Sequence, residues 1–346
     1  MTKLTSHFLF LFALVYTTAM AAWPPMNYAA NTIYTRSLSM GGAFTAMESG
    51  IENALYNPAA MQSRTIYNAG LDIFLSPVGG TSALLSPSEL SQRNDKDAYD
   101  WLSAVGLFAR ALTFSNQLLQ LSLVLSEELP DNPEKLDEKK IVSTRGHLDW
   151  NYHMASMRLS LAKQVSLGVT GYAFNMLRED ELRNNSGLMH RFGASYGILM
   201  RPSDNLTAGV SYFKFPAKVD SLMLMQHRIT DKSVNIGVVY NPFPRLSIAL
   251  DFRNVSEEEN NSTNEVHAGI EFVPTRFLAL RTGYYRQNLE KIDTVAAGFG
   301  LGDYRSFVAQ TDRFVFSNII LNYALEIASV RDDPSYAHYL TFLIRF

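Results

Sequence analysis

The chain contains no cysteine, and this absence excludes disulfide frameworks and thiolate metal sites. It is compatible with an oxidising compartment, in which a cysteine-free chain has nothing to oxidise into a disulfide. A strong charge of one sign is also missing, since the formal net charge is -3. We therefore expect no nucleic-acid partner, because such partners select basic surfaces.

Long apolar runs are missing beyond the first residues. A membrane-spanning helix needs ~20 apolar residues, and no uninterrupted run of about 18 follows the N-terminus. Residues 1–21 have the layout of a secretory signal peptide, with Lys3 at the start, an apolar core from Phe8 to Val15 and small residues before a cleavage site after Ala21. We expect export through the Sec pathway. The mature chain is then either a secreted soluble protein or a membrane-spanning barrel.

Alternation of apolar with small or polar residues is the dominant pattern from Thr65 onward, clearest in 245–254 and 265–273. Each segment has about ten residues, the length with which a tilted strand crosses a membrane. The 17 Tyr and 21 Phe suit the aromatic girdles of such barrels. We predict an all-β protein, a transmembrane antiparallel β-barrel of about fourteen strands. The expected strands are 65–76, 101–113, 117–126, 148–161, 165–177, 190–200, 205–214, 233–241, 245–254, 265–273, 276–286, 291–301, 313–327 and 337–346, and 101–126 is apolar enough to be partly helical.

The connections between these segments alternate in length, as short periplasmic turns and long external loops do in outer-membrane barrels. Two connections depart from the rule, since 287–290 is short for an external loop and 302–312 is long for a periplasmic turn. The alternation favours a barrel over a soluble sandwich and places both chain ends in the periplasm. The expected short connections are 114–116, 162–164, 201–204, 242–244 and 274–275, and the long ones are 77–100, 127–147, 178–189, 215–232, 255–264 and 328–336.

The stretch from Arg36 to Met61 differs from everything after it. Gly41 and Gly42 permit close backbone approach, the segment Ala43–Leu55 has helix-like apolar spacing, and Pro58 stops a helix. An ordinary surface helix and turn in a soluble protein is the alternative. We predict that this stretch is part of a hatch that fills the barrel lumen.

The residues SLSMGGAF followed by ALYNPAAM resemble the N-terminal signature of the FadL/PorV-like outer-membrane proteins, a group that includes the FadL/TodX transporters, PorV/PorQ and uncharacterised spirochaete relatives. EVHAGIEFVPTRFLALRTGYY, VAAGFGLG, NIILNYALEI and YLTFLIRF resemble the C-terminal half of PorV-like proteins. The resemblance departs from the family at Glu48-Ser49-Gly50 and at Ala60-Met61. We expect a signal peptide at 1–21, a hatch at 22–64 and a barrel at 65–346. The expected hatch and gating residues are Gly41, Gly42, Phe44, Asn57, Pro58 and Ala59.

The last segment alternates from His338 to a terminal phenylalanine, Phe346. This ending resembles the signal by which the barrel-assembly machinery recognises its substrates, so we expect that machinery to be a partner. An amphipathic strand that simply ends on an aromatic residue is the alternative.

Seven charged residues fall on the strand face opposite the apolar one. A charge that faced lipid at mid-depth would cost about 2–4 kcal/mol, so these side chains should point into the lumen. They either pair with one another and with the hatch, or line a path on which an arginine meets a substrate carboxylate. The seven are Arg158, Arg191, Asp251, Arg253, Glu271, Arg281 and Glu326.

No constellation of residues indicates catalysis. The seven histidines lack the spacing of metal ligands, and the glycines of 296–302 are not followed by a helix as a dinucleotide site requires. We expect no enzyme activity, no metal and no cofactor.

Two functions are open. The first is passive uptake of hydrophobic compounds such as long-chain fatty acids by a FadL-like outer-membrane barrel that is gated by the hatch, with membrane lipid around the barrel. The apolar residues 222–225, in the predicted loop 215–232, suit such cargo. The second is a PorV-like scaffold or shuttle for protein secretion, in which the divergent loops 77–100 and 127–147 carry specificity.

Overall fold

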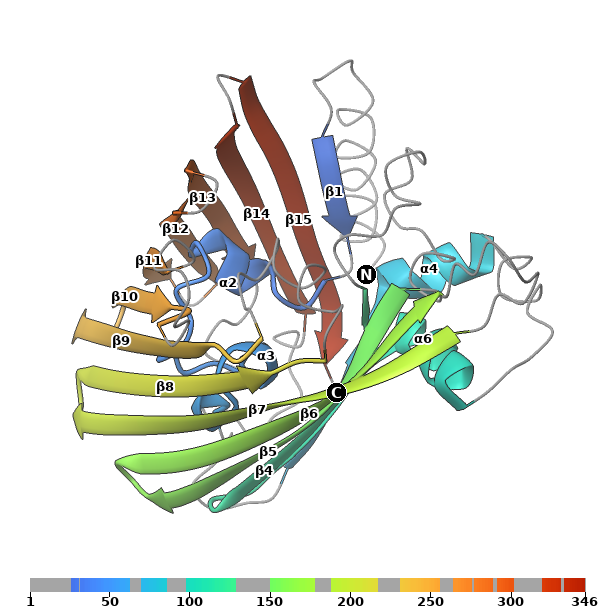
Figure 1. Ribbon diagram of the computed structural model, residues 1–346, viewed down its shortest axis with the longest axis horizontal. Coiled ribbons are helices and arrows are strands. Elements are labelled where there is room, and N and C mark those ends of the chain that lie inside the picture. The colour runs from blue at the N-terminus through green and yellow to red at the C-terminus, as the bar shows by residue number, and fades with distance from the viewer. Residues whose placement is uncertain are drawn as a thin grey trace.

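The structure is a computed structural model, and it describes residues 26–30, 32–62, 70–85, 98–128, 150–177, 188–216, 231–255, 264–275, 277–288, 291–301, 319–330 and 333–345. Strands β2 to β15 form a closed antiparallel ring, in which each strand pairs with its neighbours in the chain and β15 pairs with β2 (Figure 1). The prediction of an all-β barrel of about fourteen strands is therefore confirmed. The strands are β2 Gly70–Leu75, β3 Ala109–Ser115, β4 Leu119–Glu128, β5 Trp150–Ala162, β6 Val165–Leu177, β7 Leu188–Ser203, β8 Leu206–Lys214, β9 Val234–Phe243, β10 Leu246–Arg253, β11 Glu265–Thr275, β12 Leu278–Gln287, β13 Ile292–Leu301, β14 Ile319–Val330 and β15 Asp333–Arg345.

The ring closes through a short seam. Only the last two residues of β15 pair with β2, Ile344 with Leu75 and Arg345 with Phe74. Nearer the start of β15, residues 336–340 pair in parallel with β1 (Met26–Ala30). This strand was not predicted from the sequence. Residues 26–30 therefore lie along the seam, and the chain enters the lumen after them.

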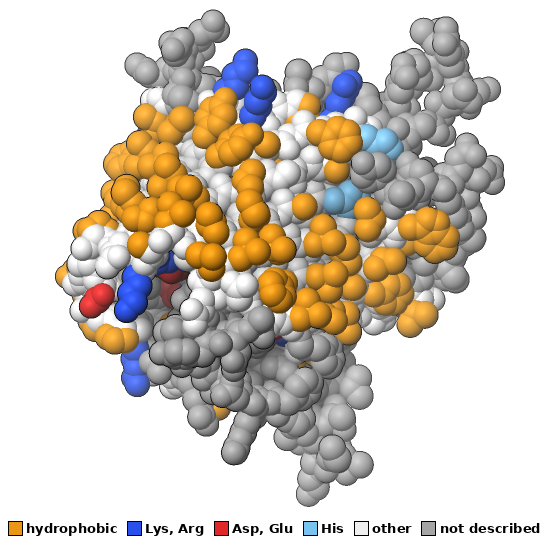
Figure 2. Space-filling model, turned by 90° about the horizontal axis from the view of Figure 1, so that it is seen from below, with side chains coloured by type: hydrophobic (Ala, Val, Ile, Leu, Met, Phe, Trp, Pro, Cys, Tyr) orange, Lys and Arg blue, Asp and Glu red, His pale blue; other side chains and the backbone are white. Residues whose placement is uncertain are grey.

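The alternation in the sequence appears as two faces of one wall. In β12, Leu280 and Tyr284 are exposed on the outside, whereas Arg281 and Tyr285 are buried on the inside. Figure 2 shows how hydrophobic side chains spread over one face of the barrel. Such an outward apolar coat is what a bilayer selects on a membrane-spanning barrel. No helix in the described ranges is long and apolar enough to cross a membrane.

Two predicted connections differ from the structure. The expected strand at 101–113 begins as a helix, α6 (Ala98–Phe108), and a second helix, α4 (Pro77–Leu85), lies within the expected loop 77–100. The apolar residues of α6 stand at helical rather than alternating spacing, which explains the difference. The expected long loop 328–336 is instead a link of two residues, because Val330 pairs with Asp333 in a hairpin.

The largest buried cluster lies inside the ring. Residues 32–62, the part of the hatch that the lumen contains, supply about half of it, including Tyr34, Phe44, Leu55 and Tyr56. The wall contributes inward side chains such as Tyr152 and Phe174. The prediction that the hatch fills the lumen is therefore confirmed.

Some predicted features lie outside the described residues. They are the signal peptide at 1–21, the apolar residues 222–225, much of the loops 77–100 and 127–147, and Phe346.

Candidate functional site

The hatch crosses the lumen as short helices joined by turns. Helix α2 spans Thr35–Ser39, α3 spans Asn53–Tyr56, and the 3-10 helix η1 spans Pro58–Ala60. Their side chains are buried throughout. Helices this short are not stable alone, so contacts with the barrel wall must stabilise the conformation of the hatch.

A band of inward glycines on the wall receives the hatch backbone. At each of these positions a Cβ would crowd or overlap atoms of the hatch, so only glycine lets the two backbones approach. The band runs through strands β6 to β9 and β11 to β13, at the level where the hatch passes each strand. Its members are Gly168, Gly197, Gly209, Gly237, Gly269, Gly283 and Gly298.

The glycine pair of the hatch lies against β10 to β12. Gly41 and Gly42 have φ angles of 61° and 75°, in the left-handed region that glycine tolerates best. The Nδ1 atom of His267 donates a hydrogen bond of 2.6 Å to the carbonyl of Gly41, and Arg253 donates to the carbonyl of Gly42. A Cβ on Gly41 would lie 2.8 Å from the backbone nitrogen of Tyr284. Both predicted hatch glycines are thus in contact with the wall.

Asp251 fastens the next two hatch residues. Its Oδ2 atom accepts hydrogen bonds of 2.8 Å from the backbone amides of Phe44 and Thr45. Carboxylate bonds of this kind are stronger than neutral ones. The helix predicted for Ala43–Leu55 forms only in its last turn, as α3, because the chain turns repeatedly here and presents its amides to the wall.

The second half of the predicted signature lies against β5 to β7. The side chain of Asn57 caps η1 by accepting from Ala59 N at 3.0 Å, and it donates to the Thr45 carbonyl at 2.7 Å. Next to Pro58, the Ala59 carbonyl accepts from Arg158 Nε at 3.1 Å and from Ser166 Oγ at 2.8 Å. All three predicted positions, Asn57 to Ala59, are buried.

An ion-pair cluster fastens the first part of the hatch. Arg36 donates two hydrogen bonds of 2.9 Å to the carboxylate of Glu271, and Arg281 donates a third of 2.8 Å. Arg36 also donates to Ser49, which in turn donates to Glu52 at 2.8 Å. Burial raises the pKa of the Glu52 carboxyl above its ordinary value, although Arg36 and the hydrogen bond from Ser49 act in the opposite direction.

The remaining predicted lumen charges are also placed inside. Arg253 lies 3.7 Å from Asp251, and Glu326 accepts a hydrogen bond of 2.9 Å from Tyr339 OH. Arg191 is half-buried, near the end of β7 that follows a long connection. The structure therefore brings most of the seven charges into contact with one another or with the hatch.

The pairing of the wall is irregular between β4 and β5, beside the hatch. The register of β4 against β5 shifts between Val124 and Glu127, which indicates a β-bulge at Leu125 and Ser126. Directly opposite Val124 stands Met154, whose sulfur accepts a weak hydrogen bond of 3.6 Å from Tyr34 of the hatch. At this position the Tyr34 hydroxyl of the hatch is thus bonded to a sulfur atom and not to a carboxylate.

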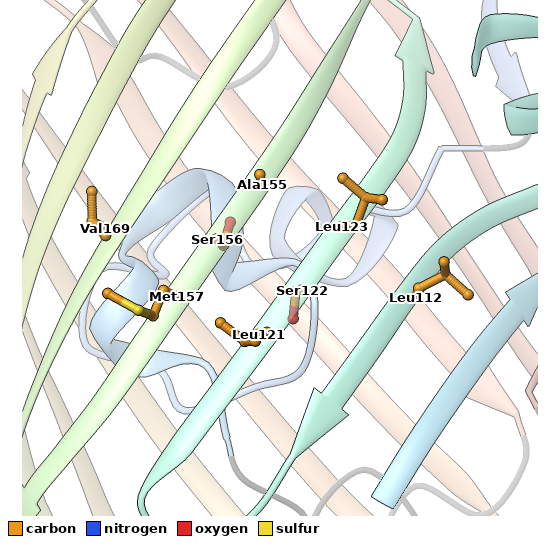
Figure 3. A pocket seen from close by; sticks show the side chains of 8 residues that line it. All are labelled: Leu112, Leu121, Ser122, Leu123, Ala155, Ser156, Met157 and Val169. Carbon is orange, nitrogen blue, oxygen red and sulfur yellow. The ribbon is translucent and has the colours of Figure 1, made fainter. Parts of the chain in front are cut away.

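A groove of about 360 Å³ opens on the outer surface next to this bulge. Figure 3 shows its lining on β3 to β6, with the hatch ribbon behind the wall. The small outward side chain of Ala155 leaves space between the larger residues of the coat, whereas Ser122 and Ser156 are buried at the inner side of the wall. The lining residues are Leu112, Leu121, Ser122, Leu123, Ala155, Ser156, Met157 and Val169.

An aromatic cluster leads from the lumen toward the same bulge. Tyr172, Phe174 and Phe215 contact one another with ring centroids 5.4–5.8 Å apart, and Tyr152 lies 5.8 Å from Phe174. Tyr152 is the β5 residue that pairs with Glu127, where the register of β4 resumes. This cluster was not predicted from the sequence, although its strand residues are aromatics on the inward, small-residue face of β5 and β6.

Within the part of the chain that the structure describes, no three His, Asp or Glu side chains gather as metal ligands. The absence of catalysis stays a prediction.

No protein-family model matches the chain, and no curated protein matches its sequence. Among solved structures, the chain is similar to the toluene transporter TbuX of Ralstonia pickettii, with 12% identity and a TM-score of 0.43 over 89% of this chain and 96% of that one. It is similar to the toluene transporter TodX of Pseudomonas putida, with 11% identity and a TM-score of 0.42 over 93% and 98% of the two chains. A variant of the porin of Rh. blastica has 10% identity and a TM-score of 0.34 over 69% and 77%. At these values the similarities say nothing about the substrate of this chain.

Proposed function

We propose that the protein is a FadL-like barrel of the outer membrane that takes up hydrophobic compounds such as long-chain fatty acids passively and releases them sideways through the wall. The observation that carries the proposal is the bulge at Leu125 and Ser126, which has an aromatic cluster on its inner side and, next to the part that helix α6 covers, an apolar groove on the outer surface. An apolar molecule could follow this route without being exposed to water.

The hatch makes a straight path through the lumen unfavourable. It is fastened by Asp251 and Glu271 on one side of the ring and by Arg158 and Ser166 on another. Each carboxylate contact would have to break before the hatch left the barrel. A sideways path at β4 avoids these contacts.

The gate in this proposal is the hatch edge at Tyr34. The Tyr34 ring packs against Tyr56, and its hydroxyl bonds the Met154 sulfur and not a carboxylate, so in this proposal a shift of Tyr34 opens the way from the aromatic cluster to the bulge. The rest of the hatch stays in place during such a shift. Gating then needs movement of a single side chain rather than release of the whole segment.

The cargo in this proposal is recognised mainly through its apolar body. Arg36 and Arg281 share Glu271, and Arg253 lies beside Asp251, so these guanidinium groups already have carboxylate partners. Neutral hydrocarbons should therefore pass at least as readily as molecules with an acidic head group.

The test is to fill the groove. Ala155 faces outward in it, and Ala155→Trp would occupy the space between β4 and β6. The control is Ala268→Trp, at an outward position of β11 on another part of the wall. We expect cells with Ala155→Trp to lose most uptake of a labelled long-chain fatty acid and of a neutral aromatic hydrocarbon, and cells with Ala268→Trp to keep it.

Equal uptake by both variants and by the unchanged protein would contradict the sideways path. Uptake no higher than that of cells with an empty vector would contradict transport altogether, and it would favour the secretion scaffold. The amount of folded barrel in the membrane is measured in each strain, so that a failure of assembly is not taken for a blocked path.

A further inference from the structure

Helix α6 carries an apolar face that the barrel does not cover. Trp101, Val105 and Phe108 are 61%, 47% and 44% exposed, and Leu102 lies on the same side. The spacing of these four residues places them on one side of a helix. We call this set the α6 face.

The opposite side of α6 is fixed to the barrel wall. Ser103 accepts a hydrogen bond of 2.9 Å from Asn151 of β5, and Leu107 is fully buried. Gly106 lies directly on β4, where a Cβ would overlap Ser126 of the bulge. The α6 face is therefore held in one orientation and does not belong to a freely moving helix.

The wall beneath α6 is the outer surface of the barrel. Along β5, Asn151 shares its side of the strand with Ala155 and Met157, which are exposed outward. The pairing of β5 with β6 is regular from Trp150 to Ser160, so the alternation is unbroken over this distance. Helix α6 thus lies on the side of the wall that faces the membrane.

The α6 face continues the apolar coat of the barrel. Phe108 is followed directly by β3, where Phe114 is exposed, and Leu121 and Leu123 are exposed on β4. Figure 1 shows α6 next to α4, at the end of the barrel away from α2. The coat and the helix therefore form one apolar surface.

The height of α6 places it at the boundary of the bilayer. A strand of 13 residues such as β5 spans roughly 43 Å along its axis. At a tilt of about 40° it rises about 33 Å, whereas the apolar band of such barrels is about 25 Å tall. Asn151, the second residue of β5, thus lies near the border of the apolar band, at the end of β5 that follows the long connection from β4. Tryptophan prefers this level because its ring is apolar and its N–H is polar.

We propose that α6 rests on the outer leaflet, with Trp101, Val105 and Phe108 inserted among lipids at the boundary between head groups and acyl chains. The occupant of the α6 face is bilayer lipid, because that face is continuous with a coat which lipid already covers. The proposal depends on the membrane-spanning barrel and not on what the barrel transports.

The test uses tryptophan fluorescence in lipid vesicles. The chain has three tryptophans, so Trp23→Phe with Trp150→Phe leaves Trp101 as the only emitter. We expect phosphatidylcholine brominated near the head group to remove at least about half of the emission, with weaker quenching by lipid brominated at the chain ends. Acrylamide in the buffer should quench little. The matched control adds Ile270→Trp and Trp101→Phe to the same background, and its emission should respond most to the deep bromines.

Emission from Trp101 that acrylamide quenches and neither lipid affects would overturn the proposal, since it would place the α6 face in water. Emission that none of the quenchers affects would also overturn it, because protein would then cover the face. Should the double substitution fail to fold, the difference between the unchanged protein and Trp101→Phe gives the same readout. Folding is verified by the heat-dependent gel mobility of the barrel.

Discussion

Gly168 and Gly171 provide a matched pair of substitutions on one strand. Both lie on β6, and an alanine at either position adds a single methyl group. At Gly168 the new Cβ would overlap the backbone of Pro58 and Ala59, which cannot rotate away as a side chain does. At Gly171 nothing lies within 4 Å of the new atom. The pair therefore separates the seating of the hatch from the general effect of alanine in a strand.

The expected cost at Gly168 follows from these contacts. Overpacking against a fixed backbone costs about 1–3 kcal/mol. The displacement also weakens the bonds from Ser166 and Arg158 to the Ala59 carbonyl, each worth about 1 kcal/mol. We expect Gly168→Ala to lower the free energy of unfolding by about 2–4 kcal/mol. Gly171→Ala should change it by less than about 1 kcal/mol and in the stabilising direction, because alanine restricts the unfolded chain.

The measurement is equilibrium unfolding by guanidinium in lipid vesicles, together with the rate at which a protease cuts within residues 32–62. Gly168→Ala should unfold at lower denaturant and expose the hatch to cleavage. Equal curves and equal cleavage rates for the two variants would refute the reasoning, since the wall would then have no close seat for the hatch.

Two further substitutions test the fastening of the hatch. Glu271→Gln leaves Arg36 and Arg281 without their shared carboxylate and should lower the free energy of unfolding by about 3–5 kcal/mol. Adding Arg281→Gln should recover part of this loss. Strictly additive effects of the two substitutions in a double-mutant cycle would count against the cluster. Asp251→Asn keeps the shape but replaces a carboxylate oxygen that accepts two amides, so we expect a loss of about 2–3 kcal/mol and faster cleavage near Phe44, whereas a stability unchanged within error would show that these amides need no charged acceptor.

The wall of the barrel could be predicted from sequence because its physical cause is local. A residue that faces lipid and a residue that faces the lumen alternate along every strand, so the pattern in β11 or β12 is visible without knowledge of the partner strands. The prediction of strands failed where the apolar residues follow the helical period and not the strand period of two. Helix α6 has apolar residues at helical spacing within a stretch that is apolar enough to pass for a strand.

The seat of the hatch could not be predicted because it depends on contacts between distant residues. In the sequence Gly283 is only a small residue on a lumen face. Its role becomes visible in the structure, where Gly41 of the hatch lies against it. In the same way, Asp251 belongs to the inward charges that the alternation identifies, but its role as an acceptor for Phe44 and Thr45 spans more than two hundred residues. The glycines alone were a usable signal, since inward positions on seven strands lack a side chain.

The narrow seam has a consequence for the order of assembly. Met26 pairs with Tyr336, so the first described strand gains its partner only after almost the entire chain has been made. The hatch that follows it is bonded to strands from β5 to β15, which surround it on several sides. If the cylinder closed first, the hatch would have to enter a closed lumen before any of these bonds could form. We therefore expect the sheet to curl around the hatch while it is still open, with the two pairs between β15 and β2 forming last.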